Sequence, residues 1–178
     1  AFTVIPYITI YLQSNAGMQT AEVPWIYLCG GVATLLSARY FGRLTDRVGK
    51  VRVFQRLALA VTVPLMATTL TQGLPLWGLL TVSTLFFTVM SGRMIPGMAM
   101  ISSAVEPRLR GTFMTLNSAV QSAAMGFAAL VAGLIIGRDA QGQLTGYWVA
   151  GLLGVLASII SAWLAGRLRL HGAPTAAI

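Results

Sequence analysis

Charge is concentrated in one short stretch of this chain, residues 39–52, with the sequence RYFGRLTDRVGKVR. On either side of it the sequence runs almost without charge for the length of a membrane. A basic segment of this kind cannot lie in lipid, because its backbone and its charges would have no partners there. The stretch therefore predicts a loop on the water side of two membrane-spanning segments.

The overall composition also indicates a membrane protein. Hydrophobic residues make up 56% of the chain and charged residues only 9%, with a mean hydropathy of +0.77, whereas soluble domains carry about 25% charged residues. In a soluble protein the net charge of +8 would suggest nucleic acid as a partner. Here the positive residues lie in short connectors between apolar segments, which favours a topology signal and no nucleic-acid partner. The single cysteine, Cys29, can form no internal disulfide.

The apolar segments predict one partial and five full transmembrane helices. As a helix, residues 1–12 would be about 18 Å long, against a hydrocarbon core of about 30 Å. We therefore expect them to be the end of a helix that begins upstream of this sequence. Pro64 falls inside the second span, where a neighbouring helix or the hydroxyl of Thr62 or Thr68 could satisfy the carbonyl that a proline frees. The five full spans are expected at residues 23–38, 52–70, 76–105, 112–136 and 147–166.

The positive residues predict the orientation of these spans. Alternate connectors face the same compartment, and positive residues favour the cytoplasmic side. Arg138 lies in a connector on the other side, and Arg93 lies within a span. This distribution places the stretch 39–52 and the C-terminus in the cytoplasm. The residues that share the cytoplasmic side are Arg39, Arg43, Arg47, Lys50, Arg52, Arg56, Arg108, Arg110, Arg167 and Arg169.

Two connectors resemble motifs of a known family. Residues 42–50 (GRLTDRVGK) resemble the G-x-L-a-D-r-x-G-r/k loop signature of the major facilitator superfamily of secondary transporters. Residues 107–111 (PRLRG), two spans later, are similar to the P-x-x-R-G that follows the fourth and tenth helices of that family. The positions that carry the two motifs are Gly42, Leu44, Asp46, Arg47, Gly49, Lys50, Arg110 and Gly111.

The resemblance implies an all-α integral membrane fold, half of a twelve-helix bundle built from two six-helix halves. The spans fit the C-terminal half best, without most of the seventh helix, although the first half is an alternative. Residues 1–171 would then form the partial helix bundle and residues 172–178 a short cytoplasmic tail. The implied partners are the lipid bilayer, a small-molecule solute and the N-terminal half of the same transporter.

The resemblance also implies a function, which is transport of a small solute by alternating access. Residues 93–96 (RMIP) and the helix with Asn117 and Gln121 are similar to the drug or sugar efflux proton antiporters of the family, which suggests the bacterial inner membrane. A uniporter or symporter of the same family and a non-transporting membrane interaction module are the alternatives. Proton coupling would need a carboxylate outside these spans, because none of them contains an acid.

An intramembrane enzyme is the competing class of function. It would need a nucleophile with a base, or a metal cluster. The chain has one histidine, His171 near its end, and no acid within any span. We therefore expect no catalytic residue, no cofactor and no metal site.

Asp46 is the only acid among the cations of the stretch 39–52, so we expect it to form an ion pair. The resemblance implies that Asp46 docks near Arg110 and near the N-terminus of a helix of the opposite half, where a carboxylate gains about 0.3–1 kcal/mol. That contact would hold the outward-open conformation and break when the halves move. Alternatively, Gly42 and Gly49 only form turns and the arginines only set topology.

Arg93 is the one charged residue deep within a predicted span. A charge at that depth costs about 2.5–3.5 kcal/mol on insertion scales, so it should face a polar cavity or a partner. The candidate partners are a substrate anion, a carboxylate of the other half and backbone carbonyls. Alternatively, the side chain extends along a tilted helix to the cytoplasmic surface.

Six further positions complete a candidate substrate cavity. Asn117 and Gln121 are four residues apart and share a helix face, where they could bind a substrate or join neighbouring helices. Because the resemblance implies that the seventh and tenth helices line the central cavity, we add two pairs from those helices. Tyr11 alternatively belongs to an interfacial aromatic belt. The added residues are Tyr7, Tyr11, Thr88 and Ser91.

Overall fold

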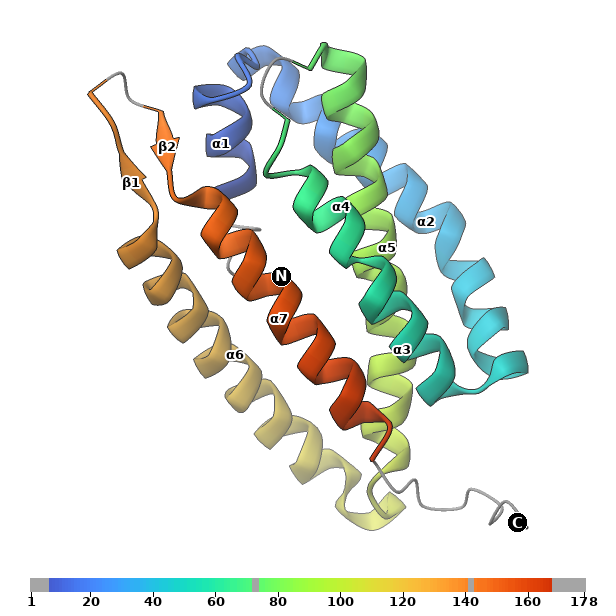
Figure 1. Cartoon of the computed structure of the whole chain (residues 1–178). Coiled ribbons are helices and arrows are strands. Elements are labelled where there is room, and N and C mark those ends of the chain that lie inside the picture. Colours follow the sequence, from blue (N-terminus) through green and yellow to red (C-terminus); the bar gives the residue numbers. More distant parts are fainter. Residues whose placement is uncertain (1–6, 72–73, 141–142, 168–178) are drawn as a thin grey trace.

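The computed structural model describes residues 7–71, 74–140 and 143–167, and in it long helices run back and forth between two ends (Figure 1). The expected tail, residues 172–178, lies outside the described residues. The helices are α1 (Ile8–Ser14), η2 (Thr20–Glu22), α2 (Val23–Val48), α3 (Lys50–Ala60), α4 (Thr62–Ala67), α5 (Leu76–Ser103), η3 (Pro107–Leu109), α6 (Arg110–Ile135) and α7 (Tyr147–Ala165). A two-stranded antiparallel hairpin, β1 (Gly137–Arg138) and β2 (Leu144–Thr145), joins α6 to α7.

The predicted all-α membrane fold is confirmed. Four helical segments within the described residues are long and apolar enough to cross a membrane, namely residues 20–48, α5, α6 and α7. The last three begin and end within two residues of the predicted spans. The predicted span 52–70 is instead covered by α3 and α4, two shorter helices with Val61 between them.

The prediction of a loop at residues 39–52 is wrong. Helix α2 continues without interruption to Val48, and α3 begins at Lys50, so Gly49 alone connects them. The error has a physical cause: a charged segment must leave the hydrocarbon, but it need not leave the helix. The 26 residues of α2 span about 39 Å, more than the hydrocarbon core of about 30 Å. The basic residues can therefore lie on a helical extension in which the backbone remains hydrogen-bonded.

The expected role of threonines around Pro64 is also wrong. Pro64 cannot donate to the carbonyl of Ala60, four residues earlier, which is where α3 ends. Thr62 Oγ1 donates to the carbonyl of Leu59 at 2.6 Å. Thr68 Oγ1 donates to the carbonyl of Leu65 at 2.7 Å. Neither hydroxyl therefore serves the carbonyl that the proline frees.

Small residues bring α2 and α5 into close contact. A Cβ placed on Gly92 of α5 would lie 2.6 Å from the ring of Phe41 in α2, and one on Gly30 of α2 would lie 2.9 Å from the ring of Phe87 in α5. In a bilayer, where lipid is as apolar as leucine, such close packing is a main source of helix association. The two helices thus make the most extensive contact of any pair of helices in the described part of the chain.

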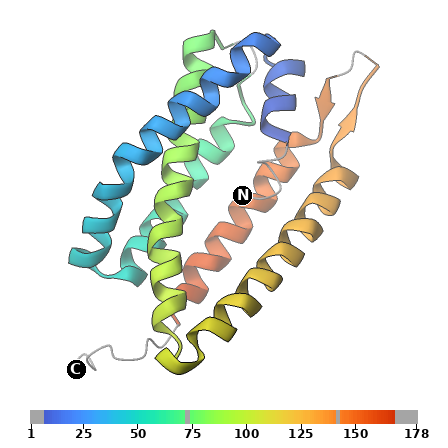
Figure 2. The ribbon, with the colours of Figure 1, turned by 180° about the vertical axis from the view of Figure 1, so that it is seen from behind.

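The other long helices surround this pair unevenly. Helices α3 and α4 pack against both α5 and α7. Helix α6 lies at the edge beside α7, and Ala132 is its one fully buried residue (Figures 1 and 2). Most residues of this long helix are therefore exposed.

The two ends of the bundle differ in charge. The C-terminal ends of α2, α5 and α7 and the first residues of α3 and α6 lie at one end, as both views show (Figures 1 and 2). Arg47, Lys50, Arg110 and Arg167 lie there, whereas Arg138 lies on β1 at the opposite end. Alternate connectors therefore lie at the same end of the molecule, as the predicted orientation requires.

Candidate functional site

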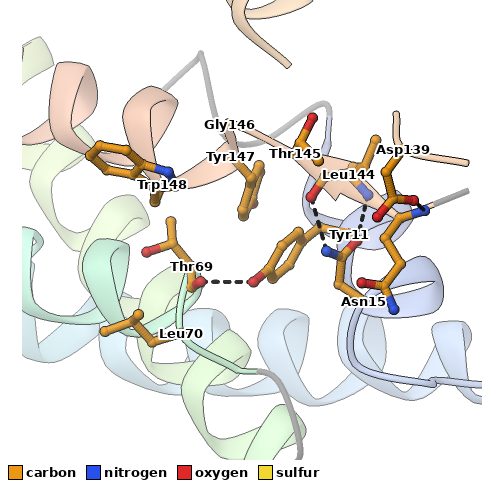
Figure 3. Close-up of a pocket in the computed structure, with 11 residues that line it drawn as sticks. Tyr11, Asn15, Thr69, Leu70, Asp139, Leu144, Thr145, Gly146, Tyr147 and Trp148 are labelled. Atoms are coloured by element: carbon orange, nitrogen blue, oxygen red, sulfur yellow. Dashed lines mark hydrogen bonds between the residues drawn. The ribbon is translucent and has the colours of Figure 1, made fainter. Parts of the chain in front are cut away.

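A cluster of polar and aromatic residues surrounds a cavity of about 580 Å³ at the end that carries Arg138 (Figure 3). The ring of Tyr11 stacks on that of Tyr147, with centroids 4.1 Å apart and planes 19° apart. Tyr11 Oη donates to the carbonyl of Thr69 at 2.7 Å. Tyr11 is only 3% exposed, so in this structure it is not a residue of a lipid interface.

Asn15 connects α1 to the hairpin in the same cluster. Its Nδ2 donates to the carbonyl of Leu144 at 2.9 Å, and its Oδ1 accepts from the amide of Leu144 at 2.8 Å (Figure 3). Tyr7 is half-buried and lies just before α1. Its hydroxyl lies close to Gly133 of α6, since a Cβ added to that glycine would be 3.2 Å from it. The two candidate tyrosines therefore fix α1 against its neighbours at one end of the molecule.

Three other candidate residues line one cavity of about 250 Å³. Arg93 reaches it from α5, whereas Asn117 and Gln121 reach it from the facing side of α6. All three side chains are half-buried. Arg93 on α5 and the two amides on α6 thus belong to a single site, although they are far apart in the sequence.

Arg93 is held by the neighbouring helices. Its Nη1 donates to Ser158 Oγ at 3.2 Å and its Nη2 donates to Ser161 Oγ at 3.0 Å, both on α7. The guanidinium carbon lies 5.0 Å from the centroid of the Phe54 ring on α3, within the range of a cation–π contact. Of the described residues, none with a carboxylate forms an ion pair with Arg93. Hydroxyls and an aromatic ring therefore hold the cation in position while its charge stays unneutralised.

A larger cavity of about 790 Å³ adjoins the Arg93 cavity, on the side of the basic end of the bundle. The two cavities share Phe54, Gly97 and Ile101 in their walls. Arg167 also lines the larger cavity, with its guanidinium 3.7 Å above the ring of Trp163. A second cation thus lines the cavity next to that of Arg93.

The remaining cavity candidates face elsewhere. Ser91 lines a separate cavity of about 410 Å³ between α2 and α5. Met90 and Met94 line both this cavity and that of Arg93, so they separate the two. Thr88 is half-buried on α5. Ser91 therefore lies on the α2 side of α5, away from Asn117 and Gln121.

The motif residues lie at the basic end and divide by exposure. Asp46 and Arg47 are exposed near the end of α2, as are Arg110 and Gly111 at the start of α6, whereas Gly42 and Leu44 are half-buried within α2. Gly49 has φ +99°, a backbone conformation that favours glycine. Lys50 Nζ donates to Ser103 Oγ at the end of α5.

Two expectations for this motif are wrong. Asp46 makes no ion pair with the described part of the chain, Arg110 included. Arg43 lies three residues earlier on the same helix, a spacing that allows pairing, but both side chains are exposed and such a surface ion pair gains little free energy. Gly42 forms no turn, because it lies inside a continuous helix.

The sequence alone did not single out several residues that build these sites. Ser158 and Ser161 are three residues apart in an otherwise apolar span, and that spacing was the available signal. Phe54, Asn15 and Tyr147 carried no such signal, because their roles depend on contacts with distant segments.

The fold and the cavities define a class of protein, an α-helical integral membrane protein with polar side chains held between its spans. A family model, the Major Facilitator Superfamily, matches residues 1–176. The chain belongs to this superfamily of membrane transporters, as the motifs at residues 42–50 and 107–111 predicted. Comparisons with curated proteins and with solved structures gave no match.

Proposed function

We propose that this chain forms one half, the C-terminal one, of an efflux-type transporter that exchanges a small solute for protons by alternating access. The observation that carries the proposal is the cavity shared by Arg93, Asn117 and Gln121. A charge within a membrane-spanning segment is costly, and such residues commonly face a substrate or ion pathway. The cavity supplies that setting between two spans.

The exposed surfaces support a complementary half. Most residues of α6 are exposed, and Asp46 has no ionic partner among the described residues. A second helical half packed against these surfaces would cover α6 and offer Asp46 a helix N-terminus. In this arrangement the basic end faces the cytoplasm of a bacterial cell, following the distribution of positive residues.

The described spans favour a second candidate function, uniport. The acids of the chain are Glu22, Asp46, Glu106 and Asp139, and each lies at or near the end of a helix or in a connector. Proton exchange therefore requires a carboxylate on helices other than these. If the complete transporter lacks such a group, it would move its solute without protons.

The test uses the complete transporter in proteoliposomes that contain a pH-sensitive dye. A panel of radiolabelled solutes, covering organic anions, sugars and organic cations, is added outside while solute entry and internal pH are recorded together. Proton antiport predicts that solute entry raises the internal pH, because protons leave in exchange. Vesicles without protein provide the control for passive leakage.

Each other outcome assigns a different function. A fall in internal pH with solute entry would identify a symporter. Entry at constant internal pH would identify a uniporter. If no solute in the panel enters faster than in vesicles without protein, the transport proposal is wrong and a non-transporting membrane module remains.

A further inference from the structure

We infer that the groove between α5 and α6 binds the anionic head group of an amphipathic organic acid, with Arg93 as the charge partner. This inference rests on the proposed transport function and specifies the class of solute. In Figure 2, α5 and α6 lie in front, with α7 behind them. The cavity that Arg93, Asn117 and Gln121 line lies between the two front helices.

The first argument is the state of the Arg93 guanidinium. An arginine has five N–H donors and a fixed positive charge. Two of these donors bond to the hydroxyls of Ser158 and Ser161, which are neutral and leave the charge uncompensated. Carboxylates fit the planar guanidinium fork well and form shorter, stronger hydrogen bonds than neutral acceptors. The serines therefore orient Arg93, and an anionic ligand can neutralise it.

The second argument is the pair of amides opposite Arg93. Asn117 and Gln121 line the same cavity, and within the described residues neither side chain makes a hydrogen bond. Each amide has two N–H donors. A head group with several acceptor oxygens could use donors from both sides of the groove at once. Arg93 would supply the charge, and the amides would position the head group.

The third argument is the apolar wall. The cavity is otherwise lined mainly by hydrophobic side chains, which favour an apolar body on the ligand. The larger adjoining cavity is also mostly apolar, and Arg167 lies in its wall. No Asp or Glu lines either cavity among the described residues. The larger hydrophobic residues in the wall of the Arg93 cavity are Phe54, Met90, Met94, Met98, Ile101 and Val120.

Together these features select ligands by charge. An organic cation would meet Arg93 without a compensating carboxylate from the described chain. A neutral solute would leave the arginine charge in a partly desolvated site, which is costly. An anion with an apolar body satisfies both the charge and the walls, so we expect it to bind more tightly than its neutral or cationic analogue.

The experiment measures equilibrium binding of radiolabelled benzoate and octanoate to the complete transporter in nanodiscs. Benzyl alcohol and benzylamine serve as the neutral and cationic analogues of benzoate. The variants are Arg93→Gln, Arg93→Lys and the double variant Asn117→Leu/Gln121→Leu. The matched control is Arg138→Gln, which removes one positive charge from an exposed position at the opposite end of the bundle.

We expect the wild-type protein and Arg138→Gln to bind at least one of the two anions more tightly than both analogues. Hydrogen bonds to charged groups contribute about 1.5–3 kcal/mol, so Arg93→Gln should weaken anion binding by about 10- to 100-fold. Arg93→Lys should bind with intermediate affinity, because it keeps the charge and loses the fork. The double amide variant should weaken anion binding while leaving benzyl alcohol unaffected.

Two results would overturn the inference. The first is that neither anion binds the wild-type protein more tightly than the analogues. The second is that Arg93→Gln and Arg93→Lys keep wild-type anion affinity, as they would if a carboxylate from another segment of the transporter neutralised Arg93. In that second case Arg93→Gln should also lower the thermal unfolding midpoint, since it would leave a carboxylate unpaired.

The inference and the proposed function can fail separately. If neutral or cationic solutes drive proton exchange in proteoliposomes while no anion binds, the solute class is wrong and transport stands. If the anions bind in an Arg93-dependent way but no solute crosses the membrane, the site stands and the transport proposal is wrong.

Discussion

Nη2 of Arg93 donates to Oγ of Ser161 at 3.0 Å, across 68 positions of sequence. This bond joins α5 to α7 in the half of α7 nearer the basic end. It explains how a charged residue inside a span is held without an acid beside it. The Arg93 side chain lies against α7 and is not extended freely to the surface. Helix α6 forms the other side of the groove.

Replacing both serine partners, in Ser158→Ala/Ser161→Ala, should destabilise the protein. Side-chain hydrogen bonds between membrane helices are worth about 0.6 kcal/mol each on average, so the loss should be about 1 kcal/mol. The thermal unfolding midpoint in detergent measures it. Ser37→Ala is the control, because the Ser37 hydroxyl donates only to Thr34 in its own helix. Equal midpoints for the double variant and the control would contradict the prediction.

Gly49→Ala should be strongly destabilising. Gly49 connects α2 to α3 with φ +99° and ψ 141°, a region that side chains avoid at a cost of about 1–3 kcal/mol. Gly42→Ala is the matched control from the same motif, since Gly42 is helical and a Cβ there has no atom within 4 Å. The yield of monodisperse protein and its unfolding midpoint compare the two. A midpoint no lower for Gly49→Ala than for Gly42→Ala would be evidence against the strained turn.

Gly92→Ala should push α2 away from α5. The added Cβ would lie 2.6 Å from the ring of Phe41, and such overpacking typically costs about 1–3 kcal/mol. Gly31→Ala is the control, because its Cβ would meet nothing within 4 Å. The double variant Gly92→Ala/Phe41→Ala should lose less stability than the sum of its single changes, with a coupling of about 0.5–3 kcal/mol. Strict additivity would show that the two residues do not touch.

Asn15→Leu should release the hairpin from α1. The change removes both hydrogen bonds to Leu144 and leaves backbone groups unpaired, at a cost of about 1–3 kcal/mol. Hydrogen exchange at the Leu144 amide should therefore accelerate. Gln13→Ala provides the comparison, since Gln13 makes only an exposed side-chain contact with Thr20. Unchanged protection of the Leu144 amide would mean that Asn15 does not hold the hairpin.

Asp46→Asn should lower transport without lowering stability. Asp46 is exposed and has no ionic partner within the described chain, so the substitution should change stability by less than about 0.5 kcal/mol. Solute flux and the unfolding midpoint are measured on the same preparation of the complete transporter. Reduced flux at an unchanged midpoint would indicate a partner in another segment, whereas normal flux would remove the docking role.

Much of the architecture could be predicted from the sequence. The ends of α5, α6 and α7 followed within two residues, because a helix in hydrocarbon needs an unbroken apolar run of fixed minimum length. The family followed from the spacing of Gly42, Asp46 and Gly49, since a local motif needs no knowledge of distant contacts. The basic stretch 39–52 was misjudged as a loop, because composition reports where a segment leaves the lipid but not whether it stays helical.

The candidate site was only partly accessible from the sequence. Periodicity showed that Asn117 and Gln121 share a face of their helix, but it could not show what that face meets. The rotation of each helix about its own axis is set by packing. In α5, for example, Gly92 faces α2 and packs against the ring of Phe41. That rotation brings Arg93 to Asn117 and Gln121 and directs Ser91 to α2.

The sequence by itself determined that this protein spans a membrane, which end of it is basic and to which superfamily it belongs. These properties depend on the free energy of moving side chains and backbone into lipid and on local motifs, and both can be derived from the sequence. Only the tertiary structure decided that Arg93 rests on the hydroxyls of Ser158 and Ser161. Such a contact depends on the relative positions of two helices, which close packing sets and a linear sequence does not state.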